Sequence, residues 1–359
     1  MKNRPRLLRI LCSLLLIVVW PWTKALAEET DPVAAHNEAA YRHYRQGNYA
    51  KALEAFQQVL AIQEKKLGGT RPDIAMIYNN IGLIHDHQGN YPEALVWYRK
   101  ALSIWEDVLG EEHPLTATAY NNIAVVYDHQ GDYAGALAWY QKDLAISEKV
   151  RGKEHPDTAT TCSNIGQVHD RRGDYEKALF WHQKALTIRE KALGKDHPDI
   201  ASIYDNIAAA FYGQGKFSEA LAWNRKALSI RENVLGKEHP SLATAYNSIA
   251  AIYNRQGEIA EAFIWYQKAL TIEESLLGKD HPDMARSYNN IAVVYEHQGN
   301  YPEALSEFLK AYRIFARTFG ETHPDAQTSK DNMEAVYRKT GNPQPFPEWL
   351  AEALHTKEF

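Results

Sequence analysis

The chain has 359 residues, of which 45% are hydrophobic, 24% charged and 11% aromatic. This composition is too rich in aromatic side chains for an intrinsically disordered protein. The formal net charge is −5, and because residues 1–27 carry five basic and no acidic side chains, the remainder carries −10. An acidic chain of this kind argues against nucleic-acid binding, since neutralising phosphates requires a surface rich in Lys and Arg.

Residues 1–27 have the pattern of a secretory signal peptide. Four basic residues precede an apolar run at 10–20, and Ala25-Leu26-Ala27 matches a cleavage site. The apolar run is about half of the ~20 residues that a membrane-spanning helix requires. We therefore expect an exported protein, periplasmic or secreted, without a membrane span in the mature chain. The alternative is an uncleaved N-terminal membrane anchor.

A Gly-x-x-His-Pro motif recurs along the chain at a fixed period. Its members begin at Gly110, Gly152, Gly194, Gly236, Gly278 and Gly320, each 42 residues after the last. Gly68 and Pro72 keep this register one period earlier, with Arg71 in place of the histidine. A fixed period in this range indicates stacked structural repeats.

One unit of the repeat contains two helical segments. Residues 74–87 have apolar or small side chains every three to four positions, which predicts a first helix, and Gly89 ends it. Asn90 and Glu93 have capping-box spacing at the start of a second helix, which Gly110 ends. Pro114 suits the first position of the following helix. The unit is therefore helix–turn–helix–turn, and a propeller of four-stranded blades is excluded.

The second helix of each unit begins with a Gly-x-[Tyr/Phe]-x-x-Ala pattern in most repeats. Examples are Gly89/Tyr91/Ala94, Gly131/Tyr133/Ala136 and Gly215/Phe217/Ala220. This pattern resembles the tetratricopeptide repeat (TPR). The 42-residue unit with Leu-Gly-Lys-[Asp/Glu]-His-Pro and Tyr-Asn-Asn is similar to the cargo-binding repeats of kinesin light chains and their bacterial relatives. The resemblance covers about residues 31–339.

The resemblance implies an all-α fold, a right-handed superhelical solenoid of stacked antiparallel helix pairs. We expect this TPR solenoid over residues 28–342, with about seven repeats and a partial eighth. Residues 343–359 form a Pro-rich tail in which a short helix caps the last apolar face, as repeat arrays require.

Several recurrent side chains have structural explanations. Trp97, Trp139, Trp181, Trp223 and Trp265 are expected to pack between repeats, with an exposed aromatic binding strip as the alternative. The histidines that begin with His113 lie one repeat apart, too far for a shared metal, so we expect them to shape turns and helix starts. Cys162, the one cysteine beyond residue 27, replaces a recurrent tyrosine and suggests a small buried side chain. No catalytic, metal or cofactor motif is found in the sequence, so an enzyme is not expected.

A stripe on the first helix is left over after the core positions are assigned. In one unit it runs through Thr118, Asn121, Asn122, Val125 and His129, and in the TPR family this stripe lines the concave surface. The asparagines predicted to line a peptide-binding groove are Asn79, Asn80, Asn121, Asn122, Asn164, Asn206, Asn247, Asn289, Asn290 and Asn332, with Ser248 as the exception in the row.

Two interpretations of these asparagines are open. Side-chain amides both donate and accept hydrogen bonds, so a row of them could pair with the backbone of an extended peptide. Alternatively, each amide bonds a neighbouring helix and orients its repeat. Arg286, beside Asn289 and Asn290, is the best candidate for binding a peptide carboxylate.

The charges along the stripe change from one end to the other. Acidic residues come early and basic residues late, which predicts a groove that is more acidic towards its N-terminal end. The residues concerned are Asp86, Asp128 and Asp170, then Arg255, Arg286, Arg338 and Lys339.

The sequence thus predicts a non-catalytic scaffold that binds a protein or peptide in a concave groove. One alternative is a regulatory or substrate-recruiting subunit of an envelope enzyme complex. Another is an intracellular cargo adaptor like kinesin light chain, against which the signal peptide argues. The sequence identifies neither the partner nor the oligomeric state, because a fold does not specify a function.

Overall fold

The computed structural model describes residues 32–67, 71–236, 239–277 and 281–355, and within these ranges it contains helices and no strands. The first helices of the repeats are α1 (Pro32–Arg45), α3 (Pro72–His87), α5 (Pro114–His129), α7 (Pro156–Arg171), α9 (Pro198–Gly213), α11 (Pro240–Gln256), α13 (Pro282–His297) and α15 (Pro324–Lys339). The second helices are α2 (Tyr49–Leu67), α4 (Tyr91–Leu109), α6 (Tyr133–Ile146, continued by the π-helical turn η1, Ser147–Arg151), α8 (Tyr175–Leu193), α10 (Phe217–Leu235), α12 (Ile259–Leu276) and α14 (Tyr301–Phe319). A short helix α16 (Phe346–His355) follows α15.

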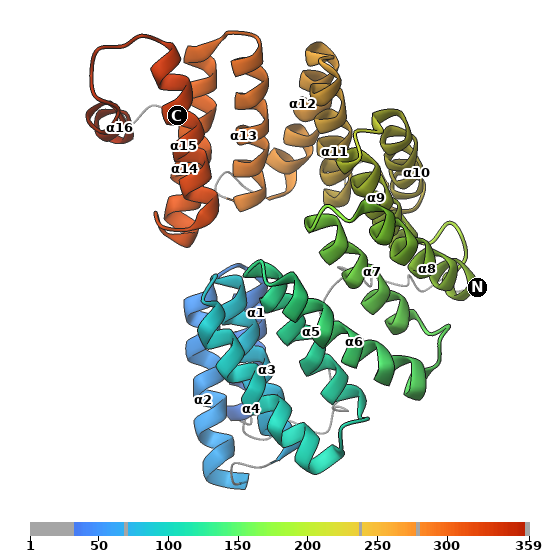
Figure 1. Ribbon diagram of the computed structural model, residues 1–359. Helices are drawn as coiled ribbons and strands as arrows, with labels where there is room; N and C mark the ends of the chain where they lie inside the picture. The colour runs from blue at the N-terminus through green and yellow to red at the C-terminus, as the bar shows by residue number, and fades with distance from the viewer. Residues whose placement is uncertain (1–31, 68–70, 237–238, 278–280, 356–359) are drawn as a thin grey trace, which may run out of the picture.

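The helices stack in chain order. Each helix packs against the next one along the chain, and most of the consecutive first helices also touch each other. Figure 1 shows the result, a curved array in which α7 and α9 lie on the inner side and α8 and α10 on the outer side. The predicted all-α TPR solenoid is confirmed.

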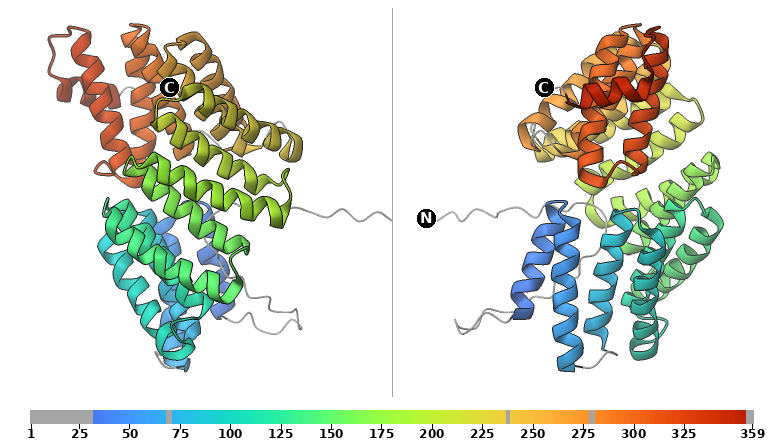
Figure 2. Two further views of the ribbon diagram at one scale, coloured as in Figure 1. Left: turned by 45° about the vertical axis from the view of Figure 1, so that its right-hand side comes forward. Right: turned by 90° about the vertical axis from the view of Figure 1, so that its left-hand side faces the viewer.

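The array coils until its two ends face each other. Figures 1 and 2 show the N-terminal repeats beneath the C-terminal ones. A cleft between them is lined by residues 47–51 and Gln88 on one side and by Thr318 and Phe319 on the other. At the C-terminus, Phe346 and Leu350 of α16 are buried against the last helix pair.

The predicted signal peptide at residues 1–27 lies outside the described residues. Among the helices that the structure does describe, none combines the length and the apolar character needed to cross a bilayer.

The recurrent histidine starts each first helix from α5 onwards. The Nδ1 atom of His113 accepts a hydrogen bond from the backbone N–H of Leu115 at 3.2 Å, and the same bond recurs in five later repeats. The expected turn and capping role of this histidine is confirmed. The expected Asn90 capping box is wrong, because the Asn90 side chain makes no capping bond. In the equivalent position, Asp132 does cap its helix by accepting from the Gly135 N–H at 2.9 Å.

Four of the five recurrent tryptophans pack on a tyrosine of their own repeat, and that tyrosine bonds the preceding repeat. The Trp139 ring lies 5.4 Å from the Tyr120 ring, and Lys142 lies over Trp139 at 4.3 Å. The Tyr120 hydroxyl donates to Glu106 of the preceding repeat at 2.6 Å. Such pairs recur at Tyr78/Trp97, Tyr204/Trp223 and Tyr246/Trp265. The tryptophans are half-buried, as expected for packing between repeats.

Cys162 takes the place of the tyrosine in the fourth repeat. Its side chain is fully buried, and burial raises the pKa of the thiol to about 11. Because the thiolate is the reactive form, this thiol is inert at neutral pH.

The middle repeats have more polar cores than the ends. Trp105 and Phe315 fill one core position near the two ends of the array, whereas the equivalent residues between them include Ser147, Arg231 and Glu273, all buried. Asp143, also buried, stands where α4 has alanine, and it accepts from Ser147 at 3.1 Å and Thr161 at 2.7 Å.

The pKa values of two buried carboxyl groups, those of Asp143 and Glu273, are shifted towards neutral pH. Burial raises the pKa of Asp143 to about 6, against hydrogen bonds from Thr161 and Ser147. Burial also raises the pKa of Glu273 to about 7; hydrogen bonds from Ser287 and Asn247 oppose the shift. Both groups are therefore easier to bury when they are protonated.

We predict that Glu273→Gln changes how stability depends on pH. A raised folded-state pKa gives a stabilisation that is complete below the ordinary value of 4.5 and is lost as pH rises through about 7. The variant should therefore gain melting temperature relative to the wild type between pH 5.5 and 8. The exposed Glu261→Gln on the same helix is the control, and its melting curve should stay parallel to the wild type over this range. Parallel curves for Glu273→Gln would contradict the assignment.

Candidate functional site

The stripe that runs along the inner side of the first helices has a central row, which we call the floor row. It comprises one residue per repeat, Leu83, Val125, Gln167, Ala209, Ala251, Val293 and Ala335. Leu83 is buried, Val125, Gln167, Ala251 and Val293 are half-buried, and Ala209 and Ala335 are exposed. All but Gln167 are apolar. The row therefore offers a mostly apolar strip with small side chains in the middle of the array.

The asparagines beside the floor row bond one another across repeats. Asn122 donates to the Oδ1 of Asn79 in the preceding repeat at 2.8 Å. Asn121 donates to Asn122 at 3.1 Å, and Asn164 of the following repeat donates to Asn121 at 2.9 Å. Four amides from three consecutive first helices thus form one continuous chain of hydrogen bonds.

The other predicted asparagines are engaged in a similar way, with different partners. Four of them donate to hydroxyl groups on neighbouring helices, namely Asn80 to Tyr41, Asn206 to Ser163, Asn247 to Ser287 and Asn289 to Ser329, at 2.8 to 3.0 Å. Asn290 and Asn332 are half-buried, and within the described residues neither side chain has a hydrogen bond.

These contacts favour the second interpretation of the asparagines. Asn79, Asn80, Asn122 and Asn164 are each less than 10% exposed. The Asn122 amide is only 1% exposed, and both its oxygen and its nitrogen are already paired within the array. In this arrangement the four amides are largely buried and each is bonded to a neighbouring first helix. Direct contact between these asparagines and a peptide stays a prediction.

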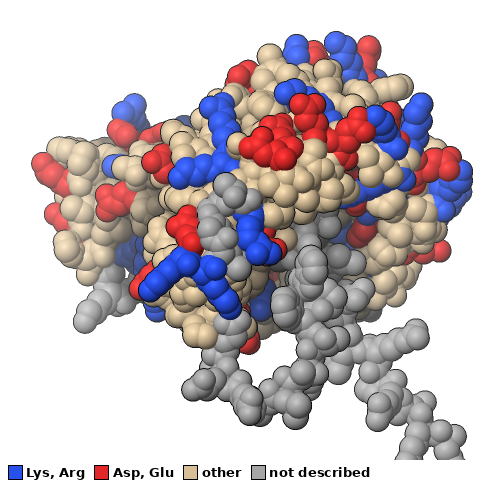
Figure 3. Space-filling view, turned by 90° about the horizontal axis from the view of Figure 1, so that it is seen from below, with Lys and Arg blue, Asp and Glu red and all other residues tan. Residues whose placement is uncertain are grey.

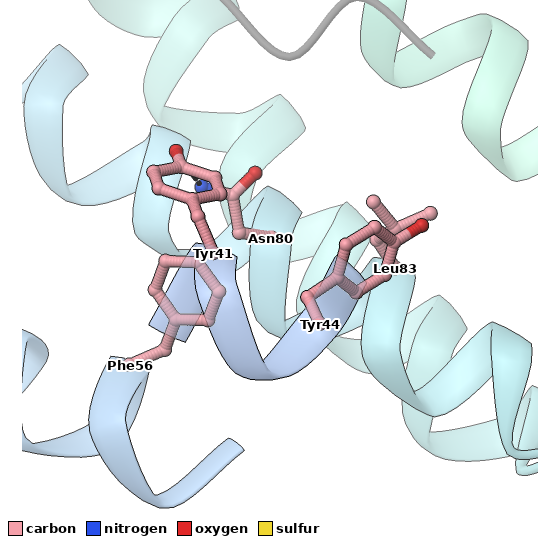
Figure 4. Close-up of a pocket in the computed structure, with 5 residues that line it drawn as sticks. All are labelled: Tyr41, Tyr44, Phe56, Asn80 and Leu83. Carbon is pink, nitrogen blue, oxygen red and sulfur yellow. Dashed lines mark hydrogen bonds between the residues drawn. The ribbon is translucent and has the colours of Figure 1, made fainter. Parts of the chain in front are cut away.

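The cavity beside Asn80 is too small for a ligand. Tyr41, Tyr44, Phe56, Asn80 and Leu83 line it, and Figure 4 shows Tyr41 from α1 facing Asn80 from α3. Its volume of about 10 Å³ is room for one water molecule. Small-molecule pockets are on the order of 300–1,000 Å³.

A second set of contacts involves the C-terminal ends of the first helices. Between repeats, His129 Nδ1 lies 2.9 Å from Asp86 Oδ1 and Arg171 pairs with Asp128, and within one repeat Asp170 lies 2.8 Å from the buried His182. The acids expected to make the N-terminal part of the groove acidic are thus paired. The first two pairs each span 43 residues, and for Asp128 and Arg171 this spacing of opposite charges is visible in the sequence.

The basic residues of the C-terminal half differ in their surroundings. Lys339 pairs with Glu296 at 2.7 Å, whereas Arg255 donates from Nε to the neutral Tyr212 hydroxyl at 2.9 Å. Arg255 has no ion pair within the described residues and therefore keeps its charge beside Ala251. 

Arg286 is exposed but lies between two carboxylates. Its guanidinium is 3.4 Å from Asp283 and 3.5 Å from Asp325. Two flanking acids repel an incoming carboxylate, so this arrangement disfavours the predicted binding of a peptide C-terminus.

The described residues were also compared with the requirements of a metal site, and one face with those of a phosphate-binding surface. In the ranges that the structure describes, no cluster of three His, Cys, Asp or Glu side chains could hold a metal ion. On the face seen in Figure 3, both basic and acidic side chains are present over most of the described surface.

Comparison with known families identifies the repeat. A sequence profile of the tetratricopeptide repeat matches almost the whole described chain, in overlapping segments at residues 32–102, 73–142, 126–191, 181–233, 199–275, 241–306 and 283–345. The chain belongs to the tetratricopeptide-repeat family. A search of curated proteins found no match.

Solved TPR structures resemble this chain at the level of the fold. The apo form of RapI has a TM-score of 0.59 and 18% identity, over 79% of this chain and 99% of RapI. BtubC (BKLC) from P. vanneervenii has a TM-score of 0.49 and 23% identity, over 67% of this chain and 93% of BtubC. A putative kinesin light chain from Podosopora anserina has a TM-score of 0.46 and 24% identity, over 58% of this chain and 98% of the other. At these identities the likeness extends to the fold alone.

We predict that Asn122→Ala destabilises the TPR array. It leaves Asn79 Oδ1 and Asn121 Nδ2 without their partners, and an unpaired buried polar group costs about 1–3 kcal/mol. The urea midpoint should fall accordingly. Asn290→Ala, in the same row but without a hydrogen bond, is the control and should shift the midpoint little. Equal midpoints for wild type and Asn122→Ala would mean that the amide chain does not hold the repeats together.

Proposed function

We propose that this TPR protein is a non-catalytic scaffold that binds a protein partner in its concave groove. TPR solenoids are typical protein-binding scaffolds. The observation that carries the proposal is the floor row, since Ala209 and Ala251 are accessible on the inner side and belong to none of the apolar core clusters of the described residues. Apolar side chains left accessible along a concave surface are what a partner can bury.

In this proposal the asparagines act on the partner indirectly. The chain through Asn79, Asn122, Asn121 and Asn164 ties three consecutive first helices together and so sets the spacing of the floor row. Of the predicted asparagines, Asn290 and Asn332 remain available for direct contact. Rigid spacing lowers the conformational entropy lost on binding.

We further propose that the scaffold works outside the cytoplasm. The support is the pattern of residues 1–27, with basic residues, an apolar run and Ala25-Leu26-Ala27. Cell fractionation with N-terminal sequencing tests this directly. Full-length protein in the cytosol would contradict export, and full-length protein in the membrane would indicate an uncleaved anchor.

We predict that negative charges on the groove floor abolish partner capture. The test protein is Ala209→Glu/Ala251→Glu, and the matched control is Ala138→Glu/Ala222→Glu, with the same substitutions on exposed positions of the second helices. Each protein is immobilised and used to capture partners from an envelope extract. For each protein that the wild type and the control capture, the amount retained on the groove variant should be lower by about tenfold or more. The reason is that burying a charge without a partner in an apolar contact is costly.

The melting temperatures of the two double variants are compared first, so that misfolding is recognised. Capture that is equal on both variants would place the binding surface elsewhere on the array.

A further inference from the structure

The inference in this section rests on the proposed groove and concerns what occupies it. We propose that the groove takes an amphipathic α-helix of the partner protein, laid along the floor row, and not an extended peptide. Three features of the structure lead to this occupant: the engaged amides, the spacing of the floor row and the small side chains at its centre.

The first feature is the small number of free backbone-pairing groups. An extended peptide brings an unpaired N–H and C=O at every residue, and burying them requires partners from the groove. Most of the amides that could supply them are already bonded, as in Asn122 to Asn79 and Asn164 to Asn121, and only Asn290 and Asn332 of the predicted row have no hydrogen bond within the described residues. An α-helix satisfies its own backbone, so it can be buried against such a surface at little polar cost.

The second feature is the spacing of the floor row. Packed helices have axes about 8–10 Å apart, and α7, α9, α11 and α13 contact one another in turn. An α-helix advances about 10.5 Å in seven residues and returns to nearly the same face. An extended strand covers the same distance in about three residues. Because neighbouring side chains of a strand alternate between its two faces, residues three positions apart point to opposite faces. One floor residue per repeat therefore matches one apolar residue per seven in a helix.

The third feature is the room at the centre of the groove. α9 presents Ser202 and Ala209, and α11 presents Thr244 and Ala251. These small side chains leave the backbone of the first helices close to the groove, where an occupant about 10 Å wide needs space. 

Charge adds one detail to the predicted occupant. Arg255 lies four residues after Ala251, and its hydrogen bond to Tyr212 leaves its charge uncompensated. A carboxylate on the partner helix, adjacent to the apolar residue that meets Ala251, would pair with this guanidinium. Interspersed acids would also keep such a segment soluble before it binds.

The test uses peptides selected on the intact protein. A display library of 40-residue fragments from the genome that encodes this chain is selected on the wild type and depleted on Ala209→Glu/Ala251→Glu. Selected fragments are synthesised in three forms: unchanged, with a central proline, and with an i,i+4 hydrocarbon staple. Alanine at the proline site is the matched control. Binding is measured by titration calorimetry and helix content by circular dichroism.

We expect the selected fragments to share an apolar residue every seven positions. Proline should weaken binding about tenfold or more, because it breaks a helix, while alanine changes it little. The staple should tighten binding by pre-organising the helix. Arg255→Gln should weaken the acidic fragments and leave their neutralised Glu→Gln versions unaffected.

Different failures are distinguishable. Groove-dependent fragments that tolerate proline or lack the seven-residue period would overturn the helical occupant. If depletion on the groove variant removes every fragment that the wild type selects, the proposed groove function itself is overturned.

Discussion

Burial between neighbouring repeats is the constraint on which the rest of this structure depends. A single helix pair cannot bury its own apolar face, so each repeat is completed by the next. The joint is specific: Tyr120 packs on Trp139 within its repeat and donates to Glu106 of the repeat before it. Because the same contacts recur in other repeats, they set the distance between neighbouring first helices. This distance is also the spacing of the floor row along the groove.

The sequence was sufficient for those parts of the fold that depend on local chemistry. The period, the two helices per unit and the capping by His113 follow from residues a few positions apart, and the structure contains them. It was insufficient for Asn122, whose partner Asn79 is 43 residues away and is set by how one repeat sits on another. An amide on a helix surface looks the same whether it faces solvent or the next helix. The charge pair of Asp128 and Arg171 has the same spacing and carried a stronger signal, because opposite charges identify each other.

The engaged amides change how selectivity can arise in this groove. A surface with many free amides recognises any extended backbone and discriminates only through side-chain pockets. Here most polar groups near the floor are paired, so recognition depends on the apolar row and on a few charges such as Arg255. Specificity of this kind favours a partner whose shape is already formed, and it penalises chains that would bring unpaired polar groups into the groove.

The polar cores of the middle repeats have a consequence for local opening of the array. In a linear array, stability is roughly a sum of repeat terms and nearest-neighbour terms, so a local deficit is not averaged over the whole chain. Repeats that bury Ser147, Arg231 and Glu273 where the ends bury Trp105 and Phe315 gain less from apolar burial. Amide hydrogens in η1, α10 and α12 should therefore exchange with solvent before those in α4 and α14. The repeats near the ends are then more stable than the central repeats. The array can change its curvature at the central repeats without unfolding.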